Sequence, residues 1–265
     1  MEKKTSDDVY NPATAPEHWI RAQDSLKTRL VLGDDFAWLL HDDDKPELDA
    51  TVLRYVGGVD VSYAKEHPTA ACGALVVLDL TTLEVVYEDF SFVHLNVPYV
   101  PGFLAFREAP VVLELLEKMK ISGHPCYPQL LMVDGNGVLH PRGFGLASHL
   151  GVLADLPSIG IGKNLHCIEG LSEAGVRQLF TAKAELGEEY IALHGQSGCI
   201  LGAAMVSAQG STKPIYISTG HRISLASAIR IVKLTCKFRV PEAIRQADIR
   251  SRAFLQRHLK LCLDH

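Results

Sequence analysis

The chain has 265 residues, of which 47% are hydrophobic and 22% charged, and its formal net charge is −5. This composition excludes a disordered chain, and a net negative charge argues against a protein that coats nucleic acid without selectivity. No linker-like segment divides the chain. We therefore expect one α/β domain over residues 1–265, with a flexible start over residues 1–13.

No apolar run is long enough to span a bilayer, and the N-terminus lacks the apolar core of a signal peptide. We therefore expect a soluble, intracellular protein with no membrane partner. The six cysteines stand singly and form no Cys-x-x-Cys pair, which favours reduced thiols over a zinc site or a disulfide framework. Between His221 and Lys260 ten Lys or Arg stand against two acidic residues, and a phosphate-facing surface or a solvated helix face explains this run equally well.

The first half of the chain predicts a helix followed by three strands. A capping pattern at Thr14–Glu17 starts a helix that runs to about Leu32, and residues 33–50 are predicted to form an exposed loop. Apolar, β-branched runs predict strands over 51–63, 70–80 and 84–93, joined by short turns into an antiparallel meander. Asp60 lies inside the first of these strands, where a charge is costly unless it is paired or bound to metal.

Residues 96–102 (NVPYVPG) place Tyr99 between two prolines. A stiff loop that presents an aromatic ring could stack on or wedge between bases, although packing on the core explains this segment better when it is taken alone. A helix is predicted over 103–120, with Glu108 near its start. The helix dipole would by itself explain an acidic residue there.

A short apolar run over 130–133 predicts a buried strand that ends in Asp134, and Gly135, Asn136 and Gly137 follow. The carboxyl ends of strands are where α/β sheets place their sites, but an Asp-Gly turn would also explain Asp134. Lys163 directly follows the next predicted strand, over 157–162, and thus has a comparable position.

The remaining elements are predicted as a helix over 143–153, a helix over 171–186, a hairpin over 190–206, a strand over 213–219 and helices over 224–236 and 241–263. On the last helix Ile244, Ala247 and Asp248 share one face, so Asp248 is expected to point inward. His221 follows a strand and a glycine. A lone histidine is more often structural than catalytic.

Three antiparallel strands followed by β-α units predict a ribonuclease H-like α/β fold: a central mixed sheet, with an antiparallel meander and parallel strands, flanked by helices. In that layout acidic residues from the first strand, the first helix, the fourth strand and a late helix converge. Such carboxylates repel one another unless divalent cations neutralise them, and the set suits two-metal phosphodiester hydrolysis. Lys163 and His221 are candidates for stabilising the developing charge or transferring protons.

Five segments, in this order, resemble the endonuclease V family over roughly Trp19 to Arg252: YVGGVDVSY, NVPYVPGFLAFREAP, LLMVDGNGVLHPRGFGLASHLGV, PSIGIGKNL and STGHRISLASAI. The resemblance implies a ribonuclease H-like fold and dependence on Mg²⁺, with Mn²⁺ as a substitute. It also implies cleavage of the second phosphodiester bond 3′ to a hypoxanthine nucleotide, leaving 3′-hydroxyl and 5′-phosphate ends.

The same resemblance implies roles for individual residues. Asp60 and Asp134 would be the principal metal ligands, and Glu108 would complete the acidic set by binding the metal directly or through water, although Ala109 stands where many members carry glycine. Lys163 would contact a phosphate, His221 would lie beside the metal site, and Asp248 would supply an acid from the late helix. The wedge would comprise Pro98, Tyr99, Val100, Pro101 and Gly102, and the pocket for the flipped base would comprise Gly135, Asn136, Gly137, Leu139 and His140, whose backbone could read the base.

The members most similar to this chain are vertebrate, which implies an endoribonuclease that cuts inosine-containing single-stranded RNA. We expect it to act as a monomer in the cytoplasm, with the nucleus and nucleolus as further locations. A deoxyinosine-specific DNA repair endonuclease is the first alternative, and a non-cleaving inosine-RNA-binding protein is the second. A domain whose carboxylates merely cap helices and turns is the least favoured interpretation. No residue announces itself as the group that would read a 2′-hydroxyl.

Overall fold

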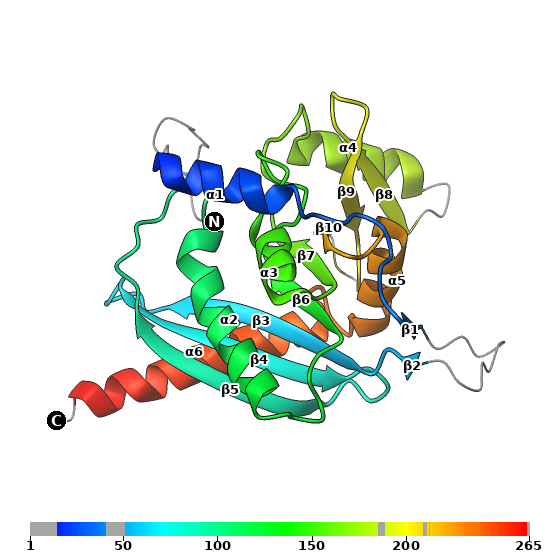
Figure 1. Ribbon diagram of the computed structural model, residues 1–265. Helices are drawn as coiled ribbons and strands as arrows, with labels where there is room; N and C mark the ends of the chain where they lie inside the picture. The colour runs from blue at the N-terminus through cyan, green and yellow to red at the C-terminus, as the bar shows by residue number, and fades with distance from the viewer. Residues whose placement is uncertain (1–14, 41–50, 185–188, 209–210, 212, 264–265) are drawn as a thin grey trace.

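An eight-stranded mixed sheet organises the computed structural model, which describes residues 15–40, 51–184, 189–208, 211 and 213–263. Its strand order is β5-β4-β3-β6-β7-β10-β9-β8, with helices on both faces (Figure 1). The strands are β3 (Tyr55–Tyr63), β4 (Ala70–Asp79), β5 (Val85–His94), β6 (Leu130–Asp134), β7 (Ser158–Gly162), β8 (Tyr190–His194), β9 (Ile200–Met205) and β10 (Ile215–His221). The predicted ribonuclease H-like layout is confirmed.

The meander of β3, β4 and β5 is antiparallel, as the apolar runs and short turns predicted. Gly57 and Gly58 do not interrupt β3, which continues as one strand to Tyr63. A Cβ on Gly58 would lie 2.1 Å from the carbonyl oxygen of Ala243, so the glycine lets a late helix pack directly on the strand. This close approach matters for the site because that helix carries Asp248.

The middle of the sheet is parallel. Strand β6 pairs with β3 on one side and with β7 on the other, both in parallel, and β10 then pairs antiparallel to β7. The peripheral hairpin predicted around Gly195 is formed by β8 and β9, and it extends the sheet beyond β10. The carboxyl ends of β3, β6 and β7 therefore meet at one edge of the sheet.

The helices are α1 (Glu17–Lys27), α2 (Ala105–Ile121), α3 (Leu146–Ala154), α4 (Glu173–Ala184), α5 (Leu225–Thr235) and α6 (Glu242–Leu263). Helices α2 and α3 cover one face of the sheet, where Leu115 and Leu150 pack against Val133. Helices α5 and α6 cover the other face, where Val232 and Ile244 are buried in one cluster with strand residues. The alternation of side chains along each strand feeds both apolar layers.

The prediction of an exposed loop over 33–50 was wrong in part. Trp38 is buried, stacks on Phe36 with ring centroids 3.7 Å apart, and belongs to the short strand β1 (Trp38–Leu39). That strand pairs in parallel with β2 (Thr51–Val52). Burial of the Trp38 ring and its stacking on the half-buried Phe36 outweigh the polar composition of the segment.

The predicted flexible start over 1–13 lies outside the described residues, as do residues 41–50 of the predicted loop. Among the helices that the structure describes, none combines the length and the apolar character that crossing a membrane requires.

Candidate active site

Asp60 and Asp134 are brought together by the register of two neighbouring strands. Val59 on β3 pairs with Val133 on β6, so the next residue on each parallel strand is an aspartate at the same level of the sheet. Asp134 in turn pairs with Ile161 on β7, two residues before Lys163. Three residues that are far apart in the sequence thus reach the same sheet edge, as the strand-end positions predicted.

Lys163 pairs directly with Asp134, and its Nζ lies 2.5 Å from Oδ2 of the carboxylate. Burial alone would lower the pKa of Lys163, but the carboxylates of Asp134, Asp248 and Asp60 outweigh this effect and raise the pKa. The side chain is therefore a permanent cation at the edge of the acidic cluster.

Two buried hydroxyls orient Asp60. The hydroxyls of Ser62 and Ser251 donate to its Oδ2 at 2.9 and 3.0 Å, and they lie 2.7 Å from each other. Sequence reasoning missed both serines. The available signals were spacing: Ser62 is two residues after Asp60 on the same strand face, and Ser251 is one helical turn after Asp248. This arrangement fastens α6 to β3 at the acidic site.

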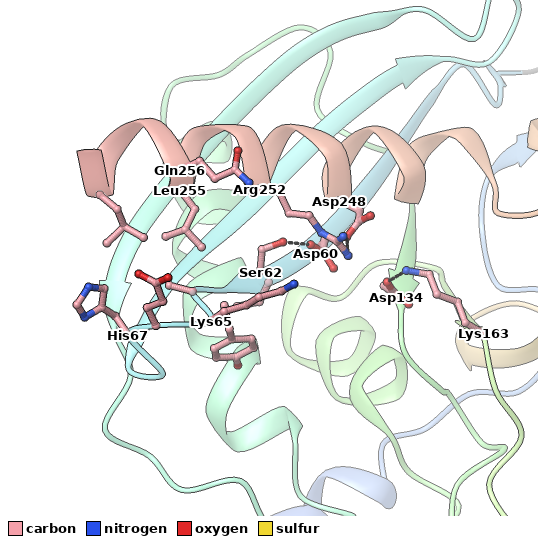
Figure 2. A pocket seen from close by; sticks show the side chains of 15 residues that line it. Asp60, Ser62, Lys65, His67, Asp134, Lys163, Asp248, Arg252, Leu255 and Gln256 are labelled. Atoms are coloured by element: carbon pink, nitrogen blue, oxygen red, sulfur yellow. Dashed lines mark hydrogen bonds and ion pairs between the residues drawn. The ribbon is translucent and has the colours of Figure 1, made fainter. Parts of the chain in front are cut away.

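Asp248 reaches the site from α6, on the inward face that its neighbours predicted, since Ile244 and Ala247 are fully buried. Its Oδ1 accepts from Arg252 at 2.7 Å, one turn later on the same helix. Figure 2 shows Asp248 beside Asp60 beneath α6, with the Asp134–Lys163 pair across from them.

Glu108 lies behind Asp60, in the first turn of α2, and its side chain is only 7% exposed. The hydroxyl of Tyr63 donates to its Oε1 at 2.9 Å, and the guanidinium of Arg107 lies 4.4 Å from the centre of the Tyr63 ring. Burial raises the pKa of Glu108 to about 8, and the nearby carboxylates of Asp60 and Asp134 raise it further. The hydrogen bond from Tyr63 and the charge of Arg107 lower it only in part. A helix-dipole role alone would not bury this carboxyl.

Asp60, Asp134, Lys163 and Asp248 line one cavity of about 800 Å³, which continues along α6 past Arg252. Burial raises the pKa of Asp60, and the carboxylates of Asp134 and Asp248 raise it further. Three oxygen-donor side chains that repel one another fit a hard divalent cation, which would remove that repulsion. Among the described residues, no three His, Cys, Asp or Glu side chains lie close enough together to hold a metal ion as they stand, and Lys163 and Arg252 neutralise part of the charge.

The proline-flanked loop ends close to α2 and leaves its aromatic side chain accessible. Tyr99 is 47% exposed, whereas Val100 is buried and its carbonyl accepts from the N–H of Phe103. Gly102 has a φ of 83°, which a side chain would strain, so the loop closes onto the helix at a glycine. The loop is therefore anchored through Val100 and Gly102.

The glycines after Asp134 serve close packing inside the protein. A Cβ on Gly137 would lie 2.0 Å from the carbonyl oxygen of Thr219. The N–H groups of Gly135 and Gly137 donate to Ile161 O and to Ser218 Oγ. These two N–H groups are therefore engaged within the fold, and the role of this segment in reading a base stays a prediction.

The rest of that predicted pocket is also drawn into the protein. Leu139 is buried in the cluster around Tyr216, and His140 Nδ1 accepts from the N–H of Arg142 at 3.2 Å. The Oδ1 atom of Asn136 is buried and has no hydrogen-bond partner among the described residues. It is the one polar atom of the segment that the packing leaves unexplained.

The structure does not bring His221 to the carboxylates, so its predicted place beside the metal site is wrong. His221 pairs with Ser158 at the start of β7, whereas Asp134 and Lys163 lie at the opposite end of β6 and β7. Its Nδ1 accepts from the N–H of Val31 at 3.3 Å. His221 does not follow the strand as predicted but is the last residue of β10, and β10 runs antiparallel to β7, which carries its end away from the site.

Comparisons with known proteins agree with this geometry. The model of the Endonuclease V family matches residues 35–249. The chain is 46% identical to human Endonuclease V over 243 residues, and this aligned region covers 92% of this chain and 84% of the human protein. It is also 46% identical to the mouse Endonuclease V, over 91% of this chain and 70% of the mouse protein.

Solved structures extend the comparison to the fold. A crystal structure of the catalytic domain of human Endonuclease V has a TM-score of 0.84 at 45% identity and covers 93% of this chain and 100% of that one. Endonuclease V of Ciona intestinalis, solved with a 24-mer DNA containing an inosine followed by a ribo-adenosine, has a TM-score of 0.82 at 34% identity, over 91% and 97% of the two chains.

The family consists of divalent-metal-dependent nucleases, and the carboxylates at the edge of this sheet supply the donor chemistry that such nucleases need. The motifs, the strand order and the comparisons agree over most of the chain. The chain belongs to the Endonuclease V family and is a nuclease, a hydrolase that acts on phosphodiester bonds.

Proposed function

We propose that this protein is a Mg²⁺-dependent endoribonuclease that cleaves inosine-containing single-stranded RNA. The cut is at the second phosphodiester bond 3′ to inosine and leaves 3′-hydroxyl and 5′-phosphate ends. The observation that carries the proposal is the juxtaposition of Asp60 and Asp134 by strand register, with Lys163 and Asp248 at the same cavity. This supplies oxygen ligands and a cation where a phosphate group would bind.

In this proposal Asp60, Asp134 and Asp248 hold the metal, and Glu108 completes the acidic set. Bound Mg²⁺, or Mn²⁺ in its place, would activate the attacking water and stabilise charge on the leaving oxygen. Ser62 and Ser251 keep Asp60 in one orientation. Lys163 stabilises the negative charge that develops on the phosphate, since it stays protonated beside Asp134.

The nucleobase specificity rests on the relatives. The Ciona intestinalis protein was solved with a strand in which an inosine is followed by a ribo-adenosine. The accessible Tyr99 ring, on a loop held by its neighbours, suits insertion beside the target nucleotide. A deoxyinosine-specific DNA endonuclease is the alternative, because most of that bound strand is DNA.

The test compares two matched end-labelled single strands that carry inosine or deoxyinosine at one site, each with Mg²⁺ and with EDTA. We expect faster cleavage of the RNA strand, one nucleotide beyond the linkage next to inosine, and none in EDTA. Equal or faster cleavage of the DNA strand would favour the DNA-repair alternative. Undiminished cleavage by Asp60→Ala protein, or in EDTA, would remove the metal site from the proposal, and tight binding without any cleavage would favour a pure binding protein.

A further inference from the structure

Gln23 on α1 contacts two loops that are far apart in the sequence. It is 1% exposed, which is unusual for a glutamine on an otherwise polar surface helix. Its Nε2 donates to Gly102 O at 3.2 Å and to Phe144 O at 2.8 Å, and its Oε1 accepts from Nε of Arg142. One side-chain amide therefore joins the end of the Tyr99 loop to the glycine-rich segment after Asp134.

Each of the two contacted loops is tied to a part of the proposed site. On one side, Gly102 closes residues 98–102, which include the exposed Tyr99 ring. On the other, the N–H of Gly145, next to Phe144, donates to Gly137 O at 2.9 Å and so ties that loop to the segment after Asp134. The spacing between the Tyr99 loop and the Asp134 segment thus passes through Gln23.

Further contacts hold α1 in place on both loops. Lys27 Nζ donates to Arg142 O at 2.7 Å, and Asp24 pairs with the guanidinium of Arg142. The Trp19 ring stacks on Phe106 of α2 with centroids 5.0 Å apart. Helix α1 therefore contacts both loops, and Gln23 is its buried polar contact to each of them.

The side-chain amide of Gln23 both joins the two loops and fixes the distance between them. The two N–H bonds of a primary amide lie in one plane at a fixed angle, so the carbonyls of Gly102 and Phe144 are held at a set separation. An apolar side chain of the same size would fill the space but would leave both carbonyls without this donor. Gln23 also lies outside residues 35–249, the range that the family model matches.

We propose that Gln23 is a positioning residue that sets the distance between the Tyr99 loop and the Arg142–Gly145 loop, and thereby the position of the Tyr99 ring relative to the segment after Asp134. The proposal rests on the proposed function, in which the Tyr99 ring lies beside the target nucleotide and Asp134 belongs to the metal site. Gln23 itself contacts Gly102, Phe144 and Arg142, none of which is a proposed metal ligand. Its effect should therefore be on engagement and selectivity for the base, not on the chemical step.

The test uses Gln23→Leu, which keeps the volume and removes all three contacts, and Gln23→Glu, which keeps an acceptor for Arg142 but turns an oxygen toward the two carbonyls. Arg21→Ala, on the exposed side of the same helix, is the matched control. The first readout is cleavage of inosine and adenosine strands. The second is the fluorescence of 2-aminopurine next to inosine, measured in EDTA so that no cleavage occurs.

We expect Gln23→Leu to raise KM for the inosine strand about tenfold, with kcat within about threefold, because the reacting groups are unchanged while the substrate is misplaced. The fluorescence rise on binding should shrink, and the preference for inosine over adenosine should fall by a similar factor. Gln23→Glu should act in the same direction, and Arg21→Ala should match the natural protein.

Unchanged KM, selectivity and fluorescence together with a lower Tm would overturn the inference and leave Gln23 a purely structural contact. If Gln23→Leu does not fold, Gln23→Glu is judged by the same readouts. Gly102→Ala then moves the spacing from the other side, because alanine is strained at the φ of 83°. If the natural protein itself shows no preference for inosine, the proposed function fails, and that result is separate from any result on the variants.

Discussion

The group of strands β6, β7 and β10 has polar side chains at both edges of the sheet, and the two edges are built differently. At the carboxyl end of β6 and β7, Asp134 and Lys163 face a cavity that Asp60 and Asp248 also line, and burial with mutual repulsion raises the pKa of Asp60. At the other end, His221 accepts from Val31 N and Ser158 donates to Ala147 O.

This difference distinguishes a ligand-binding site, formed by Asp60, Asp134 and Asp248, from a structural contact, formed by His221 and Ser158. Charges that repel one another beside a cavity destabilise the protein alone and are expected where a ligand will compensate them. Polar atoms that are satisfied by the backbone stabilise the protein alone and need no ligand. In the sequence the two ends look alike, because Asp134 and His221 each come just after a predicted strand.

The largest effect is expected when one charge is removed at the carboxylate end of the strands. Asp134→Asn should lower kcat/KM on inosine RNA on the order of a thousandfold, since it removes a metal ligand and the partner of Lys163. It should leave the Tm unchanged or higher, because the repulsion on Asp60 is relieved. Single-turnover cleavage and thermal unfolding of the same preparation measure both effects.

His221→Leu is the matched variant at the other end, and its single-turnover rate should stay within about threefold of the natural rate. A loss of activity as large as that of Asp134→Asn would mean that the two ends are not functionally distinct.

The pH dependence of stability in EDTA sharpens the same contrast, because the two ends titrate with opposite signs. The pKa of Glu108 is raised from 4.5 to about 8, mainly by burial. The folded state therefore keeps a proton that the unfolded state releases, and the free energy of unfolding should fall as pH rises from about 4.5 to 8, on the order of a few kcal/mol.

At the opposite end, burial and the neighbouring Arg222 lower the pKa of His221 below 6.5. Its contribution to stability should be complete above that pH and lost as the pH falls below it. Urea unfolding across this range should show Glu108→Gln flattening the alkaline side and His221→Leu flattening the acid side. Two variants with the same pH profile would contradict these assignments.

The smallest expected effect concerns the hydrogen bond between His221 and Val31. His221→Leu removes the acceptor of the Val31 N–H in a buried position, which should cost about 1–3 kcal/mol of unfolding free energy at pH 7.5. His194→Leu, at an exposed position at the end of β8, is the control and should change stability by less than about 0.5 kcal/mol. Equal losses in urea unfolding would show that the His221 contact contributes nothing of its own.

Asp60 was predictable because a charge inside a strand of valines and glycines is anomalous, and Asp134 because it ends an apolar run. The bracing role of Gln23, by contrast, carried no pattern at all, since α1 is amphipathic and a glutamine there is ordinary. Ser62 and Ser251 were also invisible, because serine is common and their shared partner Asp60 is 191 residues from the second of them.

The sequence by itself determined the order of the elements, the family motifs and the strand-end carboxylates, because these depend on local patterning that each segment carries alone. Tertiary structure decided which strand ends meet. The antiparallel direction of β10 took His221 away, the parallel register of β3 and β6 joined Asp60 to Asp134, and the glycine at position 58 let α6 bring Asp248 to them. Register, strand direction and close packing are relations between segments, so no single segment contains them.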